Sequence, residues 1–101
     1  MTKVKFIVLF VLMSGLSTMS YAGDAAAGKS KSAMCAACHG AEGISSNGMW
    51  PNLAGQKEDY LKKQMKAFRD GDRKDPMMAP MAASLSDDDI DNLAAYFSSL
   101  K

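Results

Sequence analysis

Two stretches of the chain carry apolar residues at the spacing of an α-helix. Leu61, Met65 and Phe68 fall at positions i, i+4 and i+7, which predicts a helix over 56–70 with one apolar stripe. A helix is also predicted over 86–100, because Ser86 caps its start and an apolar stripe follows. This second stripe consists of Ile90, Leu93, Ala94, Phe97 and Leu100. Each helix is therefore predicted to bury one face.

The remaining pattern predicts one more helix and two loops. Residues 23–37 are rich in alanine and contain no β-branched residue, which favours a short helix. Glycine, serine, asparagine and proline interrupt 40–55, and Pro76 and Pro80 stiffen 71–85, so both segments are predicted to be loops. Because no strand-like alternation occurs, the predicted fold class is all-α.

The first 22 residues have the pattern of a cleaved export signal. Lys3 and Lys5 precede an unbroken run of eight apolar residues from Phe6 to Met13, and Ser20-Tyr21-Ala22 has small residues where a signal peptidase cleaves. The run is far shorter than the roughly 20 residues that span a bilayer. We therefore predict a cleaved signal peptide over 1–22, a single domain over 23–101 and no stable membrane insertion.

Charge excludes one class of function and size suggests a cofactor. Removal of Lys3 and Lys5 lowers the 12 basic side chains to 10, against 11 acidic ones, a net charge of −1. A general nucleic-acid-binding protein needs a basic excess, so that class is excluded. A domain over 23–101 is small enough for its hydrophobic core alone to be marginal, so a bound metal or cofactor is expected to assist folding.

The most informative motif is Cys35-Ala36-Ala37-Cys38-His39. Two cysteines three residues apart followed by a histidine are typical of covalent haem c attachment, with thioether bonds from both thiols and the imidazole on the iron. A disulfide across so short a loop would restrict the unfolded chain little. A thioredoxin-like pair needs a strand–helix–strand context, and a zinc site needs a fourth ligand. We therefore predict one covalently bound haem c with its iron.

The sixth iron ligand is left open by this reasoning. His39 is the only histidine, so a second histidine ligand within the chain is excluded. Met65 belongs to a helical apolar stripe and is expected to be a core residue. The remaining candidates in a proline-stiffened segment are Met77, Met78 and Met81. A histidine–methionine pair would leave no open position on the iron, which favours electron transfer over other chemistry.

Several separated motifs, in this order, resemble the class I cytochromes c, the small soluble single-haem kind of the bacterial periplasm. The chain also resembles one half of the two-domain dihaem cytochromes c. The motifs are Gly23 to Gly28, Cys35 to Gly40, Trp50 to Gln56, Tyr60-Leu61, Phe68 to Gly71, Leu85 to Asp87 and Leu93 to Phe97. The resemblance implies the cytochrome c fold, three or more short helices and long loops wrapped around one covalently bound haem.

The resemblance also implies roles for single residues. Cys35 and Cys38 would form the thioethers, and His39 would be the proximal iron ligand. The Pro51 carbonyl would accept a hydrogen bond from His39 Nδ1. Met78, eight residues before Ser86, would be the distal ligand, with Met77 and Met81 as alternatives.

Further implications concern packing and the haem propionates. Gly28 would let the first helix cross the last one closely near Tyr96 and Phe97. Haem faces would be covered by Leu53, Leu61, Met65, Phe68, Leu85, Ile90, Leu93 and Phe97. One or more hydrogen-bond donors would neutralise the propionates, with Trp50, Gln56, Tyr60 and Arg69 as candidates.

The resulting functional hypothesis is a monomeric periplasmic electron carrier, not an enzyme. It would pass single electrons between larger redox proteins, such as membrane respiratory complexes. The alternatives are a dedicated haem subunit of a dehydrogenase or oxidase, and a haem sensor or peroxidase with an open iron site. The last needs a distal acid–base residue, and the chain has no second histidine. A basic cluster between 57 and 74 could steer an acidic partner, although acidic residues in the same stretch favour a solvated helix face.

Overall fold

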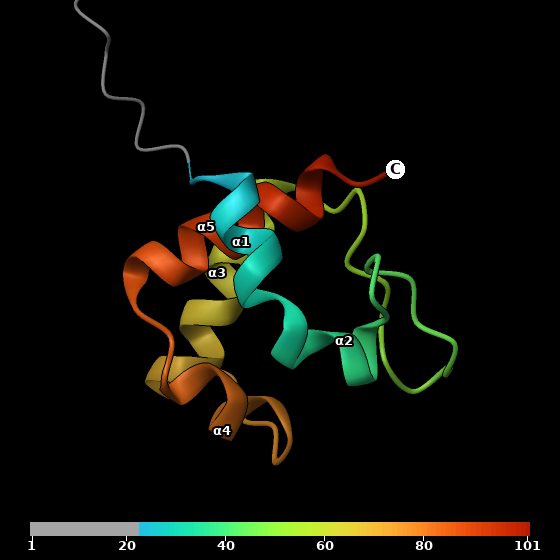
Figure 1. Cartoon of the computed structure of the whole chain (residues 1–101). Helices are drawn as coiled ribbons and strands as arrows, with labels where there is room; N and C mark the ends of the chain where they lie inside the picture. Colours follow the sequence, from blue (N-terminus) through green and yellow to red (C-terminus); the bar gives the residue numbers. More distant parts are fainter. Residues whose placement is uncertain (1–22) are drawn as a thin grey trace, which may run out of the picture.

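The computed structural model describes residues 23–101, so the predicted signal peptide over 1–22 lies outside the described residues. Five helices occur between residues 23 and 101: α1 (Ala25–Lys31), α2 (Ala33–His39), α3 (Glu58–Asp70), α4 (Met78–Ala83) and α5 (Asp87–Ser99) (Figure 1). No strand is present between residues 23 and 101, which confirms the all-α fold class. Within that range, none of the helices is long and apolar enough to cross a bilayer.

The first predicted helix is two helices, and Ser32 causes the break. The Ser32 hydroxyl donates to the Lys29 carbonyl over 2.7 Å, and a serine that bonds back to its own helix bends it. Ser32 then serves as the N-cap of α2, whose end at His39 lies two residues beyond the predicted boundary. The helix break therefore gives the segment with both cysteines and the histidine its own direction (Figure 1).

The two helices predicted from apolar stripes are both present. Helix α3 ends before Gly71, as expected, and buries Leu61 and Phe68. Helix α5 begins with the predicted capping box, in which Ser86 Oγ accepts from Asp89 N and Asp89 Oδ2 accepts from Ser86 N, each over 3.0 Å. The buried stripe of α5 contains Ile90, Leu93, Ala94 and Phe97, and Leu100 is partly buried.

The predicted loop over 71–85 contains a helix, α4. Asp75 Oδ1 accepts hydrogen bonds from the backbone of Met77 and Met78, each over 2.8 Å, so its side chain supports the first turn. Pro80 lies within that first turn, where backbone N–H groups have no partner inside the helix and a proline is tolerated. The prolines that favoured a loop are thus compatible with a short helix.

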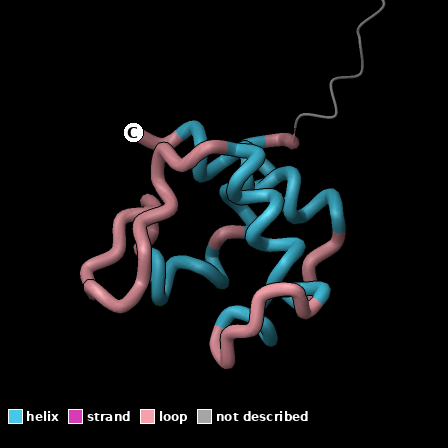
Figure 2. The backbone as a smooth tube through the Cα atoms, turned by 180° about the vertical axis from the view of Figure 1, so that it is seen from behind, coloured by secondary structure: helices cyan, strands magenta, loops and turns pink. Residues whose placement is uncertain are grey.

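Helix α5 lies at the centre of the packing, with α1 across it and α3 alongside it. Ile90 and Leu93 of α5 are fully buried. A Cβ on Gly28 of α1 would lie 1.9 Å from the Asn92 carbonyl oxygen and 2.8 Å from Tyr96 Cβ, so the predicted close crossing is confirmed. Figure 2 shows the loop between α2 and α3 to the left of these helices and the turn before α4 below them.

Candidate functional site

Helix α2 carries the two thiols and the imidazole of the haem motif. Cys35 and Cys38 are one helical turn apart, are both half-buried, and are not joined by a disulfide. Burial raises the pKa of the Cys35 thiol, and the neighbouring Cys38 raises it further. Both side chains are therefore available as thiols on one segment of helix.

His39 ends α2 with its ring buried and only 6% exposed. Its Nδ1 lies 2.8 Å from the Pro51 carbonyl oxygen. Because a carbonyl can only accept, Nδ1 carries the proton and Nε2 keeps its lone pair for a metal. A histidine that donates from one nitrogen to a carbonyl while the other is free has the arrangement of a metal ligand.

The chain turns away from the helix immediately after His39. Gly40 has a φ of 86°, a conformation that favours glycine, and a Cβ at this position would lie 1.9 Å from the Ile44 carbonyl oxygen. The following loop returns to the histidine because the Gly43 carbonyl accepts from Leu53 N and Ala54 N over 2.8 and 3.0 Å. This closure brings Pro51 beside the His39 ring.

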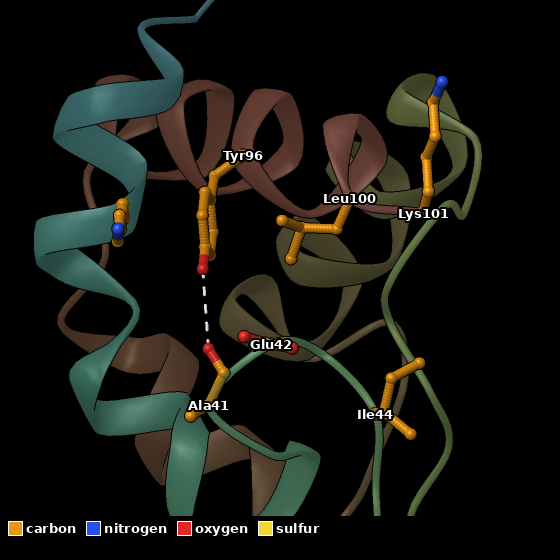
Figure 3. Close-up of a pocket in the computed structure, with 7 residues that line it drawn as sticks. Ala41, Glu42, Ile44, Tyr96, Leu100 and Lys101 are labelled. Atoms are coloured by element: carbon orange, nitrogen blue, oxygen red, sulfur yellow. Dashed lines mark hydrogen bonds between the residues drawn. The ribbon is translucent and has the colours of Figure 1, made fainter.

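Two contacts hold this loop against α5. Gly55 N donates to the Phe97 carbonyl over 2.9 Å. The Tyr96 hydroxyl lies 3.4 Å from the Ala41 carbonyl oxygen (Figure 3). A cavity of about 530 Å³ opens beside this contact, lined by Lys29, Ala41, Glu42, Ile44, Tyr96, Leu100 and Lys101. None of the predicted haem ligands lines this cavity, so it is separate from the candidate site.

The three candidate methionines differ in burial. Met77 and Met81 are 54% and 40% exposed, whereas Met78 is half-buried and packs against the hydrophobic core. Asp75 fixes the backbone of Met78 at the start of α4. Met78 is thus the one of the three whose side chain the fold directs inward.

The described structure limits which residues could cover a haem face. Ile90 and Leu93 have no exposed surface, so other side chains surround them in this structure, and their expected contact with a haem face stays a prediction. Their role is to pack the helices together. Leu53 and Met65 keep partly exposed surface at the edge of the core and remain candidates.

Arg69, a candidate partner for the propionates, is occupied elsewhere. Its guanidinium donates to Asp70 Oδ1, Asp87 Oδ1 and the Leu85 carbonyl over 2.9, 2.7 and 3.3 Å. Gln56 Oε1 accepts from Lys57 N over 2.9 Å. Trp50 is half-buried and Tyr60 is exposed. The hydrogen bonds of Arg69 therefore link α3 to α5.

Two polar residues that support the site were not singled out from the sequence. Asp75 supports Met78, and Asn52 Oδ1 accepts from Ser45 N over 2.7 Å in the loop that contains Pro51. An aspartate two residues before a methionine pair was a possible signal for the start of a helix. A single asparagine in a loop of glycine and serine gives no comparable signal.

The donor set fits a covalently attached haem. Among residues 23–101, no three His, Cys, Asp or Glu side chains are grouped to hold a metal ion directly. Covalent attachment needs no such group, because the thiols bond to porphyrin carbons and only the imidazole, with a second axial ligand, meets the iron. A helical domain with this arrangement defines a c-type haem protein.

Comparison with known proteins places the chain in one family. The family model for cytochrome c matches residues 25–101. Cytochrome c-554(548) of Halomonas halodenitrificans is 52% identical over 81 residues, which cover 77% of this chain and 98% of that protein. The chain belongs to the cytochrome c family, and its cofactor is haem c.

Other relatives are longer than this chain. Cytochrome c4 of Pseudomonas aeruginosa is 48% identical over 98 residues, which cover 96% of this chain and 49% of that protein. The crystal structure of reduced recombinant cytochrome c4 from Pseudomonas stutzeri superposes with a TM-score of 0.76 and 46% identity, over 79% of this chain and 47% of that one. The chain thus spans about half the length of the cytochrome c4 relatives, and the cytochrome c fold is confirmed.

Proposed function

We propose that this protein is a periplasmic carrier of single electrons and not an enzyme. Residues 1–22 would direct export and be removed, and the domain over 23–101 would bind one haem c. Cys35 and Cys38 would form the thioethers, with His39 as proximal and Met78 as distal ligand. The observation that carries the proposal is the buried His39, whose Nδ1 is held by Pro51 and whose Nε2 has no hydrogen-bond partner among residues 23–101.

Haem c, when bound, supplies a one-electron iron couple. The residues of this chain decide how that couple behaves. The Pro51 carbonyl polarises the His39 N–H, which makes Nε2 a stronger donor and fixes the ring orientation. With His39 and Met78 as its two protein ligands, the iron would offer no site for a substrate. Such a site can exchange electrons with little rearrangement and does no other chemistry.

Burial and backbone support favour Met78 as the distal ligand. Its side chain packs on the core, whereas Met77 and Met81 are largely exposed. The two hydrogen bonds to Asp75 hold the start of α4 in one conformation, so the Met78 side chain leaves the backbone from a fixed point. A ligand presented in this way would need little rearrangement when the iron changes oxidation state.

Partners are proposed to be other redox proteins, which this monomer would meet transiently. The basic cluster between 57 and 74 is partly neutralised, because Lys62 pairs with Glu58 and Asp91 at 3.6 and 3.8 Å and Arg69 pairs with Asp87. Four lysines of the cluster remain without an ion pair in the described part of the chain: Lys57, Lys63, Lys66 and Lys74. If they steer an acidic partner, the electron-transfer rate falls steeply with added salt. A flat salt profile would support a solvated helix face.

The first test is the absorption spectrum of oxidised and reduced protein made in a host that exports it and attaches haem. We expect a sharp c-type reduced spectrum and, in the oxidised protein, the weak red band of iron–methionine sulfur. A high-spin spectrum that changes on adding cyanide would show an open site and overturn the carrier proposal. Absence of haem absorbance would overturn the proposed roles of Cys35 and Cys38.

A dedicated haem subunit would need the same iron site, so a second measurement separates it from a free carrier. Gel filtration of a periplasmic extract shows the size of the native species. We expect the haem to elute at the size of the single domain. Elution of all the haem with a much larger complex would instead support the subunit hypothesis.

A further inference from the structure

The loop that carries Pro51 is closed by a side-chain hydrogen bond from its next residue. Asn52 Oδ1 accepts from Ser45 N over 2.7 Å, across a separation of seven residues. The neighbouring Leu53 N and Ala54 N both donate to the Gly43 carbonyl. Backbone bonds therefore anchor the chain after Asn52, and the Asn52 side chain anchors the peptide that joins it to Pro51.

The geometry of that peptide determines the hydrogen bond to His39. The pyrrolidine ring fixes the φ of Pro51, so the direction of its carbonyl depends only on ψ, which is set by the position of Asn52. The Pro51 carbonyl is the acceptor that lies 2.8 Å from His39 Nδ1. Any freedom at Asn52 therefore changes the angle and length of the His39–Pro51 bond.

We propose that Asn52 is a positioning residue that tunes the haem iron through the Pro51 carbonyl and the His39 imidazole. The inference rests on the proposed function, in which His39 is the proximal ligand. A short, aligned hydrogen bond at Nδ1 makes the imidazole a stronger donor, and a stronger donor stabilises the ferric state. Loss of the Asn52 anchor lengthens that bond and raises the reduction potential.

The loop contains a matched control for this effect. Asn47 Oδ1 accepts from Met49 N over 2.9 Å, so Asn47 and Asn52 are both exposed asparagines whose side chains accept one backbone hydrogen bond. Asn47 is not adjacent to Pro51. Asn47→Ala therefore removes a comparable bond from the same loop without freeing the carbonyl that faces His39.

The experiment uses haem-loaded protein with Asn52→Ala, Asn47→Ala and Asn52→Asp. Two quantities are measured: the midpoint potential, and the exchange rate of the His39 Nδ1 proton by NMR in the reduced state. For Asn52→Ala we expect a higher potential and an exchange rate about two- to tenfold faster, the factor for one hydrogen bond. Asn47→Ala should match the wild type in both. Asn52→Asp keeps the acceptor and should restore slow exchange, with a potential no higher than that of the wild type because its added charge is negative.

Each outcome decides the inference. It is overturned if Asn52→Ala behaves like Asn47→Ala, or if Asn52→Asp exchanges as fast as Asn52→Ala. Asn52→Leu keeps the side-chain size without the acceptor and replaces Asn52→Ala if that variant yields no haem-loaded protein. A wild-type spectrum without a histidine-ligated haem would instead contradict the proposed function, so the two failures are distinguishable.

Discussion

The guanidinium of Arg69 lies 2.7 Å from Asp87 Oδ1 and joins the end of α3 to the first turn of α5. The same group donates to the Leu85 carbonyl over 3.3 Å. The chain between these helices includes all three candidate distal ligands. Arg69 therefore closes the segment that contains the proposed distal ligand, although no part of Arg69 needs to touch the haem.

Arg69→Ala is expected to loosen the methionine segment. With both bonds to the start of α5 removed, the distal methionine should leave the ferric iron more often, so added cyanide should bind several-fold faster. Stopped-flow absorbance measures this rate. Arg73→Ala is the control, because Arg73 lies just after α3 but bonds Gln64 over 2.7 Å and stacks on Phe68 without reaching α5. Equal cyanide rates in the two variants would contradict the role of Arg69.

Gly28→Ala is expected to disrupt the crossing of α1 and α5. A Cβ at Gly28 would meet backbone atoms of Asn92 at 1.9 Å, and backbone cannot move aside like a side chain. We expect a loss of at least about 3 kcal/mol in the free energy of unfolding, the upper end of the usual cost of overpacking. Denaturant titration of the haem-loaded protein gives this value. Gly48→Ala, where nothing lies within 4 Å of the new Cβ, should change it by less than about 0.5 kcal/mol.

Replacement of the three methionines separates the distal ligand from its neighbours. Met78→Ala should remove the red absorption band of the oxidised protein, lower the potential and open the iron to cyanide. Met77→Ala and Met81→Ala should keep the band, because their side chains are largely exposed. If either of these two variants loses the band while Met78→Ala retains it, the assignment of Met78 is wrong.

Acid should destabilise the fold through aspartates that accept backbone hydrogen bonds. The Ser86 N–H lowers the pKa of Asp89, and the N–H groups of Met78 and Met77 lower that of Asp75, both from the ordinary value of 3.8. A carboxyl whose pKa is lower in the folded state adds stability above its unfolded pKa and loses it as the pH falls. We therefore expect the free energy of unfolding to decline as the pH drops below 3.8.

Asp89→Asn tests this origin of the acid sensitivity. Asparagine keeps an oxygen acceptor for the Ser86 N–H but does not titrate, so the decline should become shallower. Asp88→Asn is the control, because Asp88 is exposed in the same turn and its side chain makes no hydrogen bond in the described part of the chain. Denaturant titrations from pH 6 down to the acid limit provide the comparison. If the stability of Asp89→Asn falls with pH as steeply as that of the wild type, the Asp89 carboxylate is not the origin of the acid sensitivity.

The helices that the sequence predicted well are those with strong local signals. Helix α5 has a capping box and a regular apolar stripe, and both determine its start and its buried face. The break at Ser32 was missed because serine is a minor interruption in an alanine-rich stretch, and its effect depends on one hydroxyl bonding to Lys29. Helix α4 was missed because Pro80 indicates a loop unless its place in the first turn is known.

In the candidate site, too, the sequence predicted the features that have a local signal and missed those that depend on the fold. Cys35, Cys38 and His39 are adjacent in sequence, so their spacing alone indicated the chemistry. The position of Pro51 followed only from the family resemblance. Asn52 and Asp75 act through bonds to backbone groups, and a sequence pattern does not show where those groups lie.

Tyr96 and Phe97, near the end of the chain, hold the two ends of the loop that follows His39. Both contacts join residues far apart in the sequence, 55 positions in the case of Tyr96 and Ala41, so the loop closes only when α5 packs against it. Contacts between distant residues form more slowly than the turns of a helix. The local segment with Cys35, Cys38 and His39 can therefore form before the long-range contacts fix the loop that carries Pro51.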